Sequence, residues 1–308
     1  MKVIKTTVHQ MFFDEKCLRL ICVGQAINVF DLKTMKKIKR IGGFHYLSYG
    51  AIDYKNDKLY VTNTLGDISI FNLGDLSYIN SVKTGVTDGK LTVNETDGRV
   101  CIWGFAHYRS LVAIVDPKTL NVRRFDVDEG PNFTSLRLYT SSSHKLFRFV
   151  GDDFYLIKSF RVAENEKRPK YKPKTVYGIY GEDDGVLFNK KILNEWDAYV
   201  LTNVGAFDGG FYGASYMLYG ENVIPCEQLL NKKEWISFVR NYNGRFVLGS
   251  SKAVYEFTNG FTEKRKVAEL DYLSDYCEAN GKRYIGAWNR LIVADINEDI
   301  SEYDFDNR

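Results

Sequence analysis

The side chains of this 308-residue chain that could do acid–base or metal chemistry are few and scattered. The four histidines are His9, His45, His107 and His144. None belongs to an H-E-x-x-H zinc helix, and the chain has neither a G-x-x-x-x-G-K-[ST] phosphate loop nor a G-x-S-x-G nucleophile elbow. The five cysteines include no C-x-x-C pair, a pattern typical of free thiols in a reducing compartment. The sequence therefore predicts no catalytic residue, no metal ligand and no cofactor.

Composition favours an all-β protein. Aromatic residues make up 15% of the chain, with 21 Tyr and 20 Phe, and such residues are enriched in strands. The net charge is only +3, because 42 Lys and Arg oppose 39 Asp and Glu, so nothing in this balance requires nucleic acid or an anionic membrane surface. No window approaches the roughly 20 apolar residues of a membrane span, and the polar N-terminus does not resemble a signal peptide. We expect a cytoplasmic protein, or an extracellular one if a leader has been removed.

The elements that must position any site are strands joined by a recurring turn. The segment Asp31-Leu-Lys-Thr-Met35 returns as Asn72-Leu-Gly-Asp-Leu76 and as Asp116-Pro-Lys-Thr-Leu120. The steps are 72 − 31 = 41 and 116 − 72 = 44 residues, and a short apolar run precedes each copy. Asp and Asn accept hydrogen bonds from backbone amides that follow them, so each copy predicts a strand-to-turn junction.

A second recurring feature is the hairpin dipeptide. Asp97-Gly98, Asn243-Gly244 and Asn280-Gly281 precede β-rich runs and are typical of two-residue hairpins. Together with the first repeat they predict a four-stranded antiparallel meander of about 40–45 residues, the period of a propeller blade. Dividing 308 residues by 7 gives 44, so we expect a single domain over 1–308 with seven blades around a central channel. An irregular insertion is expected at about 161–195.

The run LYVTNTLGDISIFNLGDL at 59–76 resembles the YVTN-type β-propeller repeats, which are relatives of the WD repeats. The run AIVDPKTLNV at 113–122 is similar to the turn-and-strand half of the same repeat. The likeness covers two or three blades, and elsewhere only the spacing agrees. The Gly-His pair of WD repeats does not occur, so the hydrogen-bonded tetrad of that family does not carry over. The resemblance implies a propeller fold and a general role in binding or scaffolding, and it implies no reaction.

In such a propeller, the loops that join strand b to c and strand d to the next strand a share one face. Large rings and arginines on such a face are the usual anchors of protein and peptide interfaces. The predicted partner-binding residues are His45, Tyr46, Trp103, His107, Tyr108, Arg109, Trp288 and Arg290. Rings that fill the space between blades are the alternative interpretation. By the same geometry, His9 and His144 are expected in strand-edge or a–b turn positions on the other side.

The sequence thus predicts a non-catalytic scaffold that binds an unidentified protein or peptide, with no nucleic acid and no membrane span. The alternative is an enzyme of the lyase or lactone hydrolase type, or a small-ligand or glycan binder, acting at the channel mouth. His45, His107 and Asp152 would then be the candidates, because related propellers place a metal or a His–carboxylate pair where strands converge. The basic run 161–174 is interpreted as a solvated insertion, because Glu164 and Glu166 dilute its charge.

Overall fold

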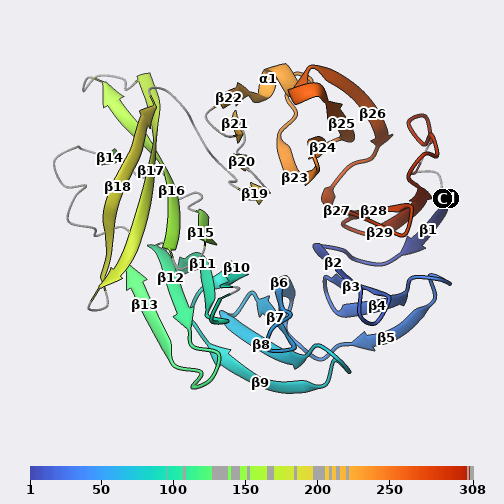
Figure 1. The fold of residues 1–308 in the computed structure, drawn as a ribbon, viewed down its shortest axis with the longest axis horizontal. Helices are drawn as coiled ribbons and strands as arrows, with labels where there is room; N and C mark the ends of the chain where they lie inside the picture. Colours follow the sequence, from blue (N-terminus) through green and yellow to red (C-terminus); the bar gives the residue numbers. More distant parts are fainter. Residues whose placement is uncertain are drawn as a thin grey trace. The chain divides into compact units, whose positions relative to one another are not determined.

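The computed structural model describes the chain apart from residues 95, 107–108, 127–137, 140–145, 151–152, 165–169, 184–185, 197–204, 208–209, 213–215, 220–221, 304 and 306–308. Side chains are described for most of residues 1–124 and 224–305. The chain forms two compact units (Figure 1). Unit 1 comprises Met1–Leu47 and Gly205–Arg308, and unit 2 comprises Ser48–Val204.

Over its described residues, unit 1 contains four antiparallel sheets of four strands each. The first sheet consists of β2 (Gln10–Asp14), β3 (Arg19–Val23), β4 (Ile27–Asp31) and β5 (Lys37–Ile41). The second consists of β19 (Gly205–Phe207), β20 (Gly210–Tyr212), β21 (Tyr216–Tyr219) and β22 (Asn222–Pro225), followed by the short helix α1 (Cys226–Leu229). The third consists of β23 (Ile236–Tyr242), β24 (Arg245–Ser250), β25 (Ala253–Thr258) and β26 (Glu263–Glu269), with a 3₁₀ turn at Asn259–Phe261.

The fourth sheet of unit 1 joins the two ends of the chain. It consists of β27 (Leu273–Ala279), β28 (Lys282–Ala287), β29 (Arg290–Asp295) and the N-terminal strand β1 (Lys2–Lys5). Strand β1 pairs antiparallel with β29, from Lys2 opposite Val293 to Lys5 opposite Arg290. The outer strand of this sheet therefore comes from the opposite end of the sequence.

Unit 2 contains three sheets over its described residues. The first is β6 (Leu47–Asp53), β7 (Lys58–Asn63), β8 (Asp67–Asn72) and β9 (Tyr78–Lys83). The second is β10 (Thr87–Val93), β11 (Val100–Ala106), β12 (Arg109–Val115) and β13 (Val122–Asp126). The third has five strands, β14 (Leu138–Tyr139), β15 (Leu146–Val150), β16 (Asp153–Glu164), β17 (Lys170–Asp183) and β18 (Val186–Trp196). The expected irregular insertion at about 161–195 thus falls on the long strands of this last sheet.

The recurring turn has the predicted geometry in all three copies. Each first residue accepts two bonds from the turn that follows it: its backbone oxygen from the amide four residues on, and its side-chain oxygen from the amide three residues on. The backbone bonds are 2.7 Å at Asp31, 2.9 Å at Asn72 and 2.9 Å at Asp116, and the side-chain bonds are 2.8, 3.1 and 2.7 Å. The fifth residues have left-handed backbone, with φ of 51°, 57° and 61° at Met35, Leu76 and Leu120. The repeat is therefore one turn structure used between third and fourth strands.

The hairpin prediction is confirmed for two of its three dipeptides. Asn243-Gly244 joins β23 to β24 and Asn280-Gly281 joins β27 to β28, and both residues of each pair have positive φ as a type I′ turn requires. The prediction is wrong for Asp97-Gly98. There Val93 pairs with Val100, and the longer loop between them is held by bonds from Thr96 N to the Asn94 side chain and from Gly98 N to the Asn94 carbonyl, both 2.8 Å.

The core lies between neighbouring sheets, so the middle strands are buried on both faces. All five residues of β3 are buried, as are five of the six in β24 and in β28. One cluster joins β2–β4 to β27–β29, and another joins β23–β26 to β27–β29. The fourth strands are mostly exposed, as in β5 and β26. This double burial explains why the apolar runs in the sequence are continuous instead of alternating.

Candidate functional site

Rings occupy one repeated position in unit 1, the residue directly before the first strand of a sheet. His9 precedes β2, Trp235 precedes β23 and Tyr272 precedes β27. Tyr46 precedes β6 in the same way, and it belongs to unit 1. In an antiparallel meander this position lies at the same end of the sheet as the turn between the second and third strands. Trp288 lies in that turn of the β27–β29 sheet.

Most of these rings face solvent. Their exposed fractions are 62% for Tyr46, 51% for Trp235, 78% for Tyr272 and 58% for Trp288. Tyr46 and Tyr272 also have left-handed backbone, with φ of 27° and 57°, which for a bulky residue costs roughly 1–3 kcal/mol. Neither burial nor backbone preference accounts for a tyrosine at these two places. We call the set the aromatic row: His9, His45, Tyr46, Trp235, Tyr272 and Trp288.

Backbone hydrogen bonds hold the row in place. The Ser251 amide donates to the carbonyl of Trp235 at 3.0 Å, and the Trp288 amide donates to the carbonyl of Tyr272 at 3.2 Å. In both sheets the turn between second and third strands is thus tied to the connection before the first strand. Between the two sheets, the Leu270 amide donates to the Lys252 carbonyl at 2.8 Å. The loops that carry Trp235, Tyr272 and Trp288 therefore form one bonded series.

His9 connects Trp288 to the segment that carries Tyr46. Its ring lies 5.1 Å from the Trp288 ring, centroid to centroid, at an interplanar angle of 35°. Its Nδ1 lies 3.2 Å from the Leu47 carbonyl oxygen, which can only accept, so Nδ1 carries the proton. His45 packs edge-on against Tyr46 at 4.9 Å. The expectation that His9 lies on the other side is wrong, because β1 belongs to the last sheet and His9 ends the connection between β1 and β2.

The predicted partner-binding residues divide into three groups. His45, Tyr46 and Trp288 are exposed and lie in the aromatic row. Arg290 is half-buried and used within the chain, because its Nη1 donates to the Phe305 carbonyl and its Nε to the Asn289 side chain at 2.9 Å. The side chains of Trp103, His107, Tyr108 and Arg109, like those of His144 and Asp152, lie outside the described residues.

Trp235 and Tyr272 complete the row but are absent from the predicted partner-binding set. Trp235 lies beside three exposed lysines of its own and the neighbouring turn, Lys232, Lys233 and Lys252. The adjacent Glu234 carboxylate is occupied, because it accepts from Asn231 at 2.9 Å and from the Tyr255 hydroxyl at 3.2 Å. Both rings lie directly before the first strand of a sheet. This shared position could have identified them from the sequence only if the first residue of each strand had been predicted accurately.

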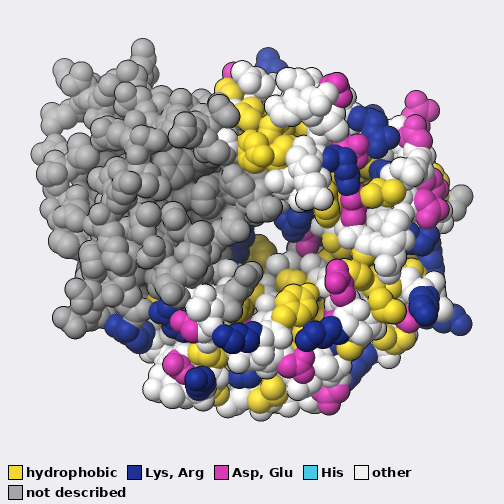
Figure 2. Space-filling view, viewed as in Figure 1, with side chains coloured by type: hydrophobic (Ala, Val, Ile, Leu, Met, Phe, Trp, Pro, Cys, Tyr) yellow, Lys and Arg dark blue, Asp and Glu magenta, His cyan; other side chains and the backbone are white. Residues whose placement is uncertain are grey.

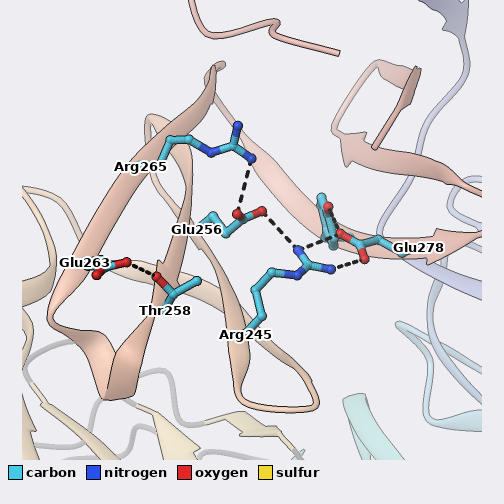
Figure 3. A network of polar contacts seen from close by, with 7 residues as sticks. Arg245, Glu256, Thr258, Glu263, Arg265 and Glu278 are labelled. Carbon is cyan, nitrogen blue, oxygen red and sulfur yellow. Dashed lines mark hydrogen bonds and ion pairs between the residues drawn. The ribbon is translucent and has the colours of Figure 1, made fainter. Parts of the chain in front are cut away.

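A polar network lies at the opposite ends of the sheets (Figure 3). Arg245 donates to Glu256 at 3.0 Å and to both carboxylate oxygens of Glu278, and Arg265 donates to Glu256 at 3.2 Å. The Tyr276 hydroxyl donates to Glu278 at 2.5 Å, and burial followed by this bond raises the Tyr276 pKa. Each carboxylate is thus matched by donors, so the network ties β24 and β25 to β27 and leaves no poised acid or base.

Three general features bear on function. Among the described residues, no group of three or more His, Cys, Asp or Glu side chains is arranged to hold a metal ion. Within that same part of the chain, no helix has the length and apolar character needed to span a membrane. Charged side chains of both signs are interspersed over the described part of the face drawn in Figure 2.

Comparison with known proteins identifies the fold. No family model matches the sequence, and no curated protein matches it. Among solved structures, the chain is similar to Kuenenia stuttgartiensis hydrazine synthase, with a TM-score of 0.63 and 11% identity over 96% of this chain and 97% of the other. It is also similar to the β-propeller domain of Myceliophteria thermophila Cps50 (Swd1), with a TM-score of 0.61 and 8% identity over 96% and 99% of the two chains. Identities this low show the fold alone: the chain is an all-β protein with the β-propeller fold.

Proposed function

We propose that this chain is a non-catalytic interaction module that binds a protein or peptide through the aromatic row. The observation that carries the proposal is the repeated ring before the first strand, which is exposed at Tyr46, Trp235 and Tyr272 and half-buried at His9. Three sheets of unit 1 and the start of β6 share it, and two of the four residues adopt an unfavourable backbone conformation. A ring kept at a structural cost, without burial, is best explained by contact with something outside the chain.

The physics of such contact favours these side chains. Tyr and Trp bury a large area with few rotatable bonds, and they keep a polar atom for a hydrogen bond. The backbone bonds between loops, and the His9–Trp288 contact, order the row before any partner arrives. Pre-ordered rings lose less conformational entropy on binding, so more of the contact energy appears as affinity. The resemblance to YVTN-type repeats supports the same role.

The test begins with peptides selected from a random display library against the full chain. Their dissociation constants are measured for the wild type and for Tyr272→Ala/Trp288→Ala. Removing two central rings should weaken binding by about 2–4 kcal/mol, which is roughly thirtyfold to a thousandfold. The matched control is Tyr54→Ala/Tyr78→Ala, which removes two tyrosines that are 50% and 51% exposed outside the row.

The outcomes are distinct. Loss of affinity in the row variant, with full affinity in the control and equal melting temperatures, supports the proposal. Equal affinity in the row variant and the wild type contradicts it. Loss of folding in the row variant would show that the rings pack the structure. The single variant Trp288→Phe, which keeps an apolar ring, then takes its place in the test. We expect it to fold and to bind the peptides more weakly than the wild type.

A further inference from the structure

Positive charge is concentrated along one outer strand. Residues 33–40 contain five cations and no acid, and no Asp or Glu occurs from Leu32 to Ile52. The five side chains are exposed, on β5 and the turn before it. A sixth cation joins them, because Lys2 Nζ donates to the Met35 carbonyl at 3.0 Å. We call this set the basic edge: Lys2, Lys33, Lys36, Lys37, Lys39 and Arg40.

Most of the charge of the basic edge is not neutralised by the described residues. Within the described residues, none of Lys2, Lys33, Lys36, Lys37 and Arg40 forms an ion pair. The preceding acid, Asp31, directs its carboxylate to the Thr34 amide and hydroxyl at 2.8 and 2.7 Å. The whole-chain charge hides the patch: a net charge of +3 with six cations in one place leaves 3 − 6 = −3 for all other residues.

Protection of the sheet edge does not require this imbalance. Lysines on outer strands prevent edge-to-edge aggregation, and β26 provides the comparison. That strand carries three consecutive cations, Lys264, Arg265 and Lys266, and two of them form ion pairs. Arg265 pairs with Glu256 at 3.2 Å, and Lys266 pairs with Glu269 at 2.8 Å. A charged outer strand can therefore have most of its cations paired within the chain, and β5 differs from β26 because none of Lys36, Lys37 and Arg40 forms an ion pair with a described residue.

An exposed aliphatic residue lies among the cations. The pairing of β4 with β5 shifts between Val29 and Phe30, which face Lys39 and Lys37, so Ile38 is left in a bulge. Its side chain is 58% exposed. A bulge disfavours the addition of a partner strand, and the segment 33–40 has no aromatic ring on which a nucleic-acid base could stack. Cations that surround an exposed aliphatic side chain match a surface whose outer layer is negatively charged and whose next layer is apolar.

We propose that the basic edge docks on an anionic lipid bilayer, with Ile38 entering the boundary between headgroups and acyl chains. The lysines and Arg40 lie at headgroup level, where each cation contributes to attraction by phosphate and carboxylate groups. None of these residues belongs to the aromatic row, so substitutions can test the two surfaces independently. The interaction weakens with salt, because exposed charges are screened.

Vesicle sedimentation tests the inference with the full chain. The vesicles are phosphatidylcholine alone, or phosphatidylcholine with roughly one-third phosphatidylserine, compared at low and high salt. The variant Lys36→Gln/Lys37→Gln/Arg40→Gln removes three unpaired cations and should lower partitioning onto the anionic vesicles about a hundredfold. The control, Lys264→Gln/Arg265→Gln/Lys266→Gln, reaches the same net charge of 3 − 3 = 0. Ile38→Ser should lower partitioning severalfold without a change in charge.

Each result decides the question. Anionic-vesicle binding that is lost in the β5 triple variant and kept in the β26 variant supports the basic edge. Equal losses in the two triple variants would show a net-charge effect and overturn the inference. Binding of the basic edge to a DNA oligonucleotide or to a poly-glutamate peptide, without vesicle binding, would also overturn it. The Tyr272→Ala/Trp288→Ala variant should bind vesicles as the wild type does.

Discussion

The left-handed backbone at Tyr272 leads to a prediction whose sign differs from the usual one. Replacing an exposed residue by Gly instead of Ala normally lowers the free energy of unfolding by about 0.4–1 kcal/mol, because Gly gains more freedom in the unfolded chain. At φ 57° the balance reverses. A residue with a Cβ pays about 1–2 kcal/mol to adopt this conformation, and Gly does not. We expect Tyr272→Gly to be more stable than Tyr272→Ala by up to about 1 kcal/mol.

Urea unfolding of the two variants at equal chain concentration measures this difference. Because Tyr272 is 78% exposed, little packing is lost in either variant, and the comparison between Ala and Gly cancels what is lost. Trp288 is the control position, since it is similarly exposed but has no positive φ, and Trp288→Gly should be less stable than Trp288→Ala. If Tyr272→Gly is the less stable of its pair, the backbone at 272 carries no strain and the argument for a retained ring fails. Both Tyr272 variants should bind selected peptides equally weakly.

Three further predictions follow from other parts of the chain. Hydrogen bonds lower the pKa of Asp31, chiefly from the Thr34 hydroxyl, and of Asp116, chiefly from the Thr119 amide. A lowered folded-state pKa gives stability that is present above the unfolded pKa, about 3.9, and is lost as the pH falls through the folded pKa. Asp31→Asn/Asp116→Asn should therefore remove part of the acid-induced loss of stability yet keep the turns, as Asn72 does; an unchanged acid unfolding profile would contradict this. The Arg283 side chain is 1% exposed, and its Nε and Nη2 have no hydrogen-bond partner among the residues that the structure describes, so Arg283→Met should raise the urea midpoint, whereas a large loss of stability would show that the guanidinium is paired. Finally, elemental analysis should find no stoichiometric metal in the purified protein, and His107→Ala should leave its metal content unchanged; one metal per chain that is lost on this substitution would favour the enzymatic alternative.

Local features were predictable because their causes are local. Asp31, Asn72 and Asp116 build their turns from bonds within five residues, so spacing alone revealed the repeat and its period. The hairpin at Asn243-Gly244 was predictable from the dipeptide alone, because its turn requires only that these two residues adopt positive φ. At Asp97-Gly98 the loop is instead organised by Asn94, three residues earlier, which the dipeptide signal does not include.

The site was predictable only in part, because its assembly depends on distant pairings. Tyr46 and Trp288 were found from their types and from the loops expected around them. His9 was placed wrongly because its position depends on β1 joining β29, nearly the whole chain away. Arg290 was expected to face a partner, but the residue that occupies it, Phe305, reaches it from the C-terminal segment. Neither contact could be predicted from the residues that neighbour His9 or Arg290 in the sequence.

The pairing of β1 with β29 also constrains the order in which the molecule can fold during synthesis. Residues 2–5 leave the ribosome long before their partner at 290–295, because nearly the whole of the described chain lies between them. Most sheets are built from neighbouring strands and can form as they emerge, but this one must wait, and closing so long a loop is slow. Until then Val3 and Ile4 lie on an unpaired strand between Lys2 and Lys5, two charges that oppose premature strand addition by other chains. Chains stalled before residue 290 should therefore carry an unpaired, aggregation-prone β1, and they are the form most in need of a chaperone.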